Sequence, residues 1–280
     1  MTDEGCPDRS PIEDVCQAVR ASLPAWAVDL GRPRGTGWTP GTDLMRPDEG
    51  PFRALLERIG EQLHTADHRT IAASFALRYG WSSGMAIAPY LLYACVPALA
   101  LDNVSFQFHD QMSCDRVAWH QLTGAMLRQD GAAPHPSVEY LTGPEPLVAR
   151  LRTSLVRQAD PVVDALSAWS QFARRGVWGL ITSAWGSQFV HVCGEIGAQT
   201  DALAHLRQLF AGDDVVSHMQ PRFYPVTYQQ VTHVCHRGAS CCRYYLLQPG
   251  QYCASCPLIS DEERLRRHTE WMKTLVASQS

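Results

Sequence analysis

Four cysteines lie within sixteen residues near the C-terminus, as Cys241-Cys242, ten further residues, and Cys253-x-x-Cys256. Four thiolates gathered at one place repel one another unless a cation or a cationic cluster shares their charge. A Cys-x-x-Cys turn places two sulfur atoms on one side of a tight loop, a geometry that metal sites use. Because Pro249-Gly250 allows the connector to turn back, we expect the two pairs to meet at a shared centre.

Several metal and redox sites compete for these thiols. Zinc on four cysteines is the simplest alternative, although such sites usually have two Cys-x-x-Cys knuckles and this chain offers one. Covalent haem is excluded because Pro257, not histidine, follows Cys256. A thioredoxin-type pair leaves the vicinal cysteines unexplained, and a Rieske-like role for His233 and His236 needs another spacing. We expect these two histidines to be solvated loop residues.

The other six of the ten cysteines are spread singly along the chain. The first ten residues contain three acidic residues and no apolar run, so we do not expect them to act as an export signal. A disulfide framework is therefore not expected, and lone cysteines on apolar segments, such as Cys95 and Cys193, are predicted to be small buried side chains. These six are Cys6, Cys16, Cys95, Cys114, Cys193 and Cys235.

The pattern Cys-Cys-x10-Cys-x2-Cys at this place in the chain resembles the FhuF-type ferric-siderophore reductases. The resemblance implies a [2Fe–2S] cluster whose ligands are Cys241, Cys242, Cys253 and Cys256, on a mainly helical protein. Looser similarities are an arginine before the pair, a tyrosine after it, proline and leucine after the last cysteine, and a Trp-Gly helix start upstream. They are Arg237, Tyr244 or Tyr245, Pro257-Leu258, and Val177-Trp178-Gly179.

The resemblance predicts an enzyme that reduces a ferric siderophore, of the hydroxamate type, by one electron and releases Fe(II) in the cytoplasm. The expected partners are the siderophore and an electron donor such as a ferredoxin or a flavin reductase. Arg237 and Arg243, beside the cysteines, are predicted to dock a partner or tune the cluster. The alternatives are a cluster-based iron or redox sensor and a non-catalytic protein with a four-cysteine zinc site.

Other residues near the motif are predicted to be structural. Arg264, Arg266 and Arg267 are expected to form one solvated helix face, with direct contact to an anionic chelate or an acidic electron donor as the alternative. The tryptophans at helical spacing are expected to pack in the core, with a chelate pocket as the alternative. They are Trp169, Trp178, Trp185 and Trp271.

Composition and charge narrow the class of protein. The formal net charge of −4 and the absence of a Lys/Arg-rich aromatic block argue against nucleic-acid binding. Residues 79–101 are uncharged but contain Gly84, Pro89 and Pro97, so buried helices are expected rather than a membrane span. The sequence thus predicts a cytoplasmic protein, while peripheral membrane association stays open.

Hydrophobic periodicity predicts a mainly α (α+β) fold, a helical body with a small β element, a cysteine-rich loop and a last helix. We expect three segments: residues 1–50, an N-terminal helix and a Pro/Gly-rich connection; 51–230, the helical body; and 231–280, the cluster segment. Strands are expected at 104–108, 138–141 and 222–234, and a capped helix at 261–277. Gly176 and Gly186 are expected to interrupt the helices between 145 and 210.

Overall fold

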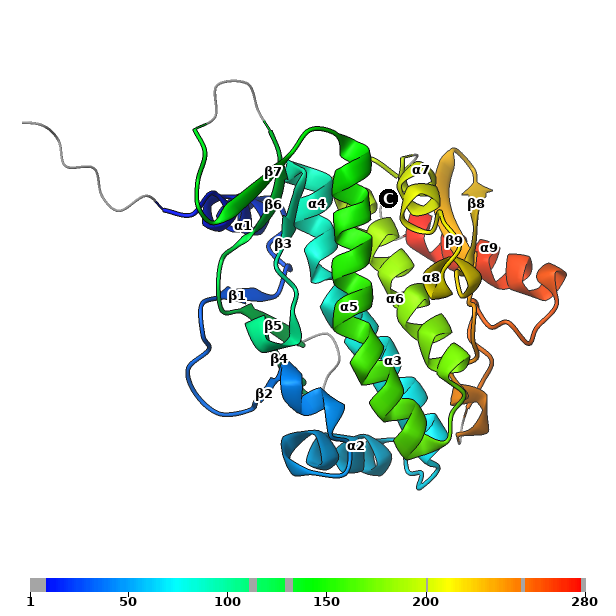
Figure 1. The fold of residues 1–280 in the computed structure, drawn as a ribbon. Coiled ribbons are helices and arrows are strands. Elements are labelled where there is room, and N and C mark those ends of the chain that lie inside the picture. The colour runs from blue at the N-terminus through cyan, green and yellow to red at the C-terminus, as the bar shows by residue number, and fades with distance from the viewer. Residues whose placement is uncertain (1–8, 111–114, 129–132, 200, 248–249, 278–280) are drawn as a thin grey trace, which may run out of the picture. The chain divides into compact units, whose positions relative to one another are not determined.

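The computed structural model describes residues 9–110, 115–128, 133–199, 201–247 and 250–277 (Figure 1). Contacts within the chain divide it into two compact units. Unit 1 comprises Met1–Thr42 and Met85–Gln158, and unit 2 comprises Asp43–Gly84 and Ala159–Ser280. This division does not test the three segments expected from the sequence, which stay a prediction.

Unit 1 combines short helices with two small sheets. α1 (Pro11–Ser22) buries Ile12, Val15 and Val19, because these residues recur on one face. One sheet has the strand order β1-β5-β4-β2 and the other β3-β6-β7. The remaining elements are β1 (Val28–Leu30), β2 (Trp38–Pro40), the start of η1 (Gly41–Met45), α4 (Ile87–Tyr93), β3 (Cys95–Pro97), η3 (Leu101–Asn103), β4 (Val104–Gln107), β5 (Arg116–Trp119), β6 (Gly124–Leu127), β7 (Val138–Leu141) and the first part of α5 (Pro144–Ser170).

Unit 2 is built on two long helices, α3 (His68–Ser83) and α6 (Arg174–Glu195). They pack closely at Gly80, where an added Cβ would lie 2.8 Å from the Cβ of Ala184. A two-stranded ribbon and the last helix follow, and this order leads the chain into the cysteines and out of them. The other elements are α2 (Gly50–Gln62), α7 (Ala202–Leu209), α8 (Val215–His218), β8 (Arg222–Tyr228), β9 (Val231–Arg237), η5 (Tyr244–Leu246) and α9 (Asp261–Ala277).

The predicted fold class is confirmed: helices dominate, the sheets are small, and the cysteine segment precedes a final helix. The uncharged stretch forms the end of α3, then α4 and β3. Among the described helices, none combines the length and the apolar character that a membrane crossing requires. The predicted strands at 104–108, 138–141 and 222–234 are found, as is the final helix.

The local structure differs from the sequence prediction in several places. The connection before residue 50 contains β1 and β2, whose three residues each are too few for a recognisable alternation. β5 and β6 were not predicted, and neither was β3, which lies at the end of the uncharged stretch where only helices were expected. Gly176 and Gly186 lie inside α6 and do not interrupt it; the ring of Phe223 occupies the space that a Cβ of Gly186 would take.

Candidate functional site

The β8–β9 ribbon leads the chain into the cysteine segment. Its strands pair antiparallel from Tyr228–Val231 at the turn to Arg222–Arg237 at the open end. Val226 and Cys235 on one side of the ribbon form a small core with Met272 of α9. The ribbon and the last helix therefore hold each other, and both ends of the cysteine segment start from fixed positions.

The segment doubles back, as expected from the sequence. The amide of Gly238, directly after β9, donates a 2.8 Å hydrogen bond to the carbonyl of Ser255. This contact places the chain before Cys241 beside the Cys-x-x-Cys turn. Pro249 lies outside the described residues, so its predicted part in the turn is not tested.

The four sulfur atoms meet as two pairs. Hydrogen bonds join the thiols of Cys242 and Cys253, and those of Cys241 and Cys256. Each pair thus combines one cysteine of the vicinal motif with one of the Cys-x-x-Cys turn. Cys256 is buried, Cys241 and Cys242 are half-buried, and Cys253 is exposed.

This arrangement supplies the four sulfur donors that a diiron cluster takes. A four-cysteine zinc site also takes four sulfur atoms, in one tetrahedron. A [2Fe–2S] cluster takes four cysteine thiolates, two on each iron, and therefore suits two adjoining pairs.

The four thiols differ in how readily they lose a proton. The hydrogen bond from Cys253 lowers the pKa of Cys242 to about 6, and the same bond strongly raises the pKa of Cys253. Burial raises the pKa of Cys241, although the amide of Arg243, 3.3 Å from its Sγ, acts in the opposite direction. Because negative charge is confined to part of the set, full ionisation needs a cationic group among the sulfur atoms.

Arg264 of α9 fixes the backbone around Cys256. Its guanidinium is 1% exposed and donates to the carbonyl of Cys256 from Nε (3.2 Å) and Nη2 (2.8 Å), and to that of Ile259 from Nη2 (2.6 Å). It also forms an ion pair with Asp261. The expectation of a solvated helix face is therefore wrong for Arg264, because its guanidinium binds the carbonyls of the turn at residues 256–259 and is buried there. Arg266 and Arg267 bind Glu263 at the surface.

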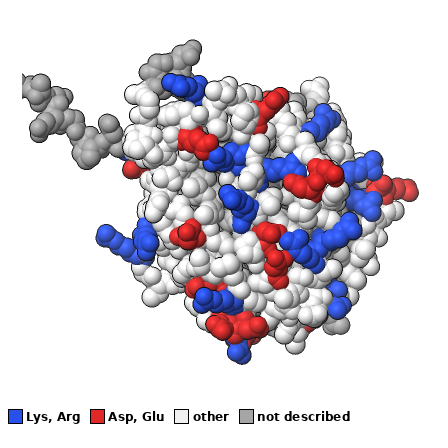
Figure 2. Space-filling model, viewed as in Figure 1, with Lys and Arg blue, Asp and Glu red and all other residues white. Residues whose placement is uncertain are grey.

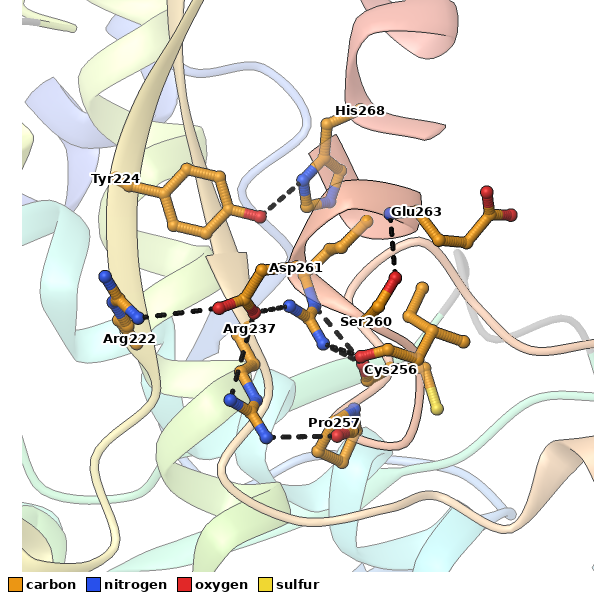
Figure 3. A network of polar contacts seen from close by, with 11 residues as sticks. Arg222, Tyr224, Arg237, Cys256, Pro257, Ser260, Asp261, Glu263 and His268 are labelled. Atoms are coloured by element: carbon orange, nitrogen blue, oxygen red, sulfur yellow. Dashed lines mark hydrogen bonds and ion pairs between the residues drawn. The ribbon is translucent and has the colours of Figure 1, made fainter. Parts of the chain in front are cut away.

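Asp261 is the centre of a wider network (Figure 3). Arg237 donates to the carbonyl of Pro257 at 3.1 Å, and its Nη1 lies 3.9 Å from Asp261. Arg222 approaches Asp261 at 3.8 Å. The predicted capping residue Ser260 accepts from the amide of Glu263 at 3.1 Å, which starts α9 directly after the last cysteine. Arg237 is thus tied to the turn that carries Cys256.

Arg243 connects the other cysteine pair to α3. It forms a 3.0 Å ion pair with Asp67, the residue that caps α3 by accepting from the amide of Thr70. Its own backbone is left-handed (φ 61°), which turns the chain sharply after Cys242. Arg243 therefore places Cys241 and Cys242 relative to α3. The sequence predicts only that this arginine docks a partner or tunes the cluster, and that prediction is not tested.

The Trp-Gly sequence of α6 lies against the same segment. An added Cβ on Gly179 would lie 2.8 Å from the Cβ of Ser240, the residue before Cys241. The amide of Ala239 donates to the hydroxyl of Ser183 at 3.3 Å, one turn along α6. Trp178 itself is fully buried and packs edge-on against Trp185. Glycine at position 179 thus permits the close approach of the segment.

The remaining candidates lie apart from the sulfur pairs. His233 and His236 belong to β9, so the expectation of loop histidines is wrong; Nδ1 of His233 lies 2.9 Å from Nε2 of Gln199. Cys95 and Cys193 are buried free thiols, as predicted, and so are Cys16 and Cys235; burial raises the pKa of each. Cys6 and Cys114 lie outside the described residues. Sequence reasoning missed Arg264, Asp67 and Ser183, since only the fold brings them to the motif.

Comparison with known proteins agrees with the geometry. Residues 239–258 match the family model of the FhuF 2Fe-2S C-terminal domain, which spans all four cysteines. The expected resemblance and the [2Fe–2S] character of the segment are thereby confirmed. No curated protein matches the chain.

Proposed function

We propose that this protein binds a [2Fe–2S] cluster through Cys241, Cys242, Cys253 and Cys256 and reduces a ferric siderophore by one electron. The observation that carries the proposal is the meeting of two thiol pairs within a segment that matches a 2Fe-2S domain of the FhuF family. When bound, the cluster supplies a centre that accepts and gives up a single electron.

The substrate chemistry needs no other catalytic group. Siderophores of the hydroxamate type are hard oxygen ligands that hold Fe(III) far more tightly than Fe(II). One electron therefore suffices to release the metal, and we propose that Fe(II) is released in the cytoplasm. A ferredoxin or a flavin reductase is the proposed source of the electron.

The residues around the thiols have distinct roles in this proposal. Cys253 is the exposed member of the four cysteines, so electrons would enter and leave the cluster on its side, where a partner can approach most closely. The amide of Arg243 beside the sulfur of Cys241 stabilises negative charge there and raises the reduction potential. Arg237 and Arg264 hold the turn after Cys253 through its carbonyls.

Metal analysis and rapid mixing test the proposal. Anaerobically purified protein is expected to contain two irons and two acid-labile sulfides per chain, and reduced protein is expected to be reoxidised by a ferric trihydroxamate. The Cys253→Ser variant is expected to lose cluster content, whereas Cys193→Ala, a buried thiol elsewhere in unit 2, is expected to keep it. Colourless zinc protein would support the structural-zinc alternative. Iron-loaded protein that the chelate reoxidises no faster than buffer alone would support a sensor.

A further inference from the structure

One pocket of unit 2 adjoins the cysteine turn and is not lined by any of the four clustered cysteines. It has a volume of about 410 Å³ and lies between α6, β9, the turn at Ala254 and α9. Cavities of a few hundred cubic ångströms are typical of small-molecule sites. Ala254, one of the lining residues, directly follows Cys253 in the chain. A molecule in this pocket would therefore lie beside the neighbour of a proposed cluster ligand.

The lining of the pocket is aromatic and rich in imidazole. It includes Trp271 and four histidines: His191, His233, His236 and His268. The indole of Trp271 is 43% exposed and is held edge-on by the ring of His233, at 4.8 Å between ring centroids. His268 is fixed by a 2.8 Å hydrogen bond with the hydroxyl of Tyr224 (Figure 3). The pocket therefore presents fixed flat rings to a ligand.

The lining also lacks acidic and strongly basic side chains. Its described residues include no lysine, arginine, aspartate or glutamate. Burial lowers the pKa of His233, of His268 and, to about 4, of His236, so these imidazoles are neutral at pH 7. The nearby cations of α9 are engaged elsewhere, Arg266 and Arg267 with Glu263 and Lys273 with Glu270. On the face drawn in Figure 2, Lys and Arg side chains are interleaved with Asp and Glu side chains.

We propose that this pocket is the seat of the ferric chelate and that it selects chelates without net charge. Three hydroxamates balance the three positive charges of Fe(III), so their complex is neutral, whereas a tris-catecholate complex carries three negative charges. Moving such a trianion onto an uncharged, partly desolvated surface is costly without compensating cations. The neutral complex loses no such hydration, and its flat hydroxamate groups can pack on the indole and imidazole rings.

This inference rests on the proposed function for its meaning, but binding can be tested without electron transfer. The probe is the gallium(III) complex of a neutral hexadentate trihydroxamate, which has the charge and shape of the iron complex and is not reduced. Trp271→Ala removes the exposed ring, and Ser187→Phe fills the pocket from α6. Leu265→Ala is the matched control, because Leu265 is a large apolar residue of α9, 50% exposed, that does not line the pocket.

Calorimetry on the cluster-loaded protein is expected to show binding of the neutral gallium complex and at least tenfold weaker binding of gallium tris-catecholate. Both pocket variants are expected to weaken the neutral complex about tenfold, the scale of one or two aromatic contacts, and Leu265→Ala to leave it unchanged. Circular dichroism and the visible spectrum check that each variant is folded and loaded.

The proposal is overturned if the neutral complex does not bind, or if both pocket variants bind it like the wild type. Rapid mixing with the ferric complex separates this failure from failure of the function. Equal reoxidation of wild type and both variants would place the chelate elsewhere and leave the reductase standing. Pocket-dependent binding without any reoxidation would leave the seat standing and refute the reductase.

Discussion

Replacement of Arg264 by methionine is expected to loosen the turn that carries Cys256 while leaving the rest of unit 2 folded. Methionine keeps much of the apolar stem but removes every donor. Two backbone carbonyls, those of Cys256 and Ile259, then lose their charged partner. The ion pair with Asp261 adds little to this loss, because Asp261 is 67% exposed.

The size of the effect follows from the two carbonyls. A hydrogen bond from a charged donor contributes roughly 1.5–3 kcal/mol, and a buried carbonyl left without a partner costs roughly 1–3 kcal/mol. Taking the lower end for the two acceptors gives about 3 kcal/mol of local stability. Since 1.4 kcal/mol corresponds to a factor of ten, the open form of the turn should become about 100-fold more populated.

The rate of cluster loss to an excess of a strong iron chelator measures this opening. If the cluster is lost from the open form, the decay of visible absorbance should be about 100-fold faster in Arg264→Met than in the wild type. Arg264→Lys should lie between them, because one ammonium cannot reach both carbonyls as a planar guanidinium does. Far-UV circular dichroism in urea reports separately on the whole fold.

Arg266→Met is the matched control, because Arg266 lies on the same helix with its side chain 64% exposed and binds only Glu263 in the described structure. Its rate of cluster loss is expected to stay within threefold of the wild type, as for most surface changes of about 0.5 kcal/mol. The reasoning is refuted if folded Arg264→Met loses its cluster no faster than Arg266→Met. Should Arg264→Met fail to fold, the comparison of Arg264→Lys with Arg266→Met decides.

Two further predictions concern the contacts of the vicinal cysteines. Gly179→Ala should push Ser240 away, since the new Cβ would lie 2.8 Å from its Cβ; a lower cluster content at unchanged far-UV circular dichroism is expected, and full loading would contradict it. Burial raises the pKa of Asp67, but hydrogen bonds from Thr70 and Arg243 outweigh it and hold that pKa below its ordinary value of 3.8. The pair with Arg243 therefore stabilises the fold above pH 3.8 and less as the pH falls through the lowered pKa. Urea midpoints of wild type and Asp67→Asn should accordingly converge in acid, and a constant difference would refute this sign.

The sequence was sufficient to predict those parts of the site that depend on neighbours in the chain. The spacing of the cysteines, the cap at Ser260 and the helix after it are local patterns, and each reappears in the structure. The return of the chain could be expected from Pro249-Gly250 in the connector. Its actual means, the bond between Gly238 and Ser255, joins residues of no distinctive type and could not be predicted.

The residues that hold the site were missed because their surroundings are set by tertiary structure. Arg264 has the sequence context of a surface arginine, with charged residues on both sides, yet it is 1% exposed. Gly186 resembles a helix break, but it lies inside α6, where the absence of a side chain leaves room for the ring of Phe223. In both cases the contacting residue lies in another element, so the local sequence pattern cannot predict the contact.

The way in which the segment is held bears on what it does. Three helices fix it by separate contacts: α3 through Asp67, α6 through Gly179 and Ser183, and α9 through Arg264. A small structural metal site commonly obtains its order from the metal, so that binding and folding are one event. Here the protein's own side chains order the thiols in advance, as a site does when geometry matters to its chemistry. The proposed electron transfer benefits from this arrangement, because ligands that are fixed in advance move little when the charge of the centre changes.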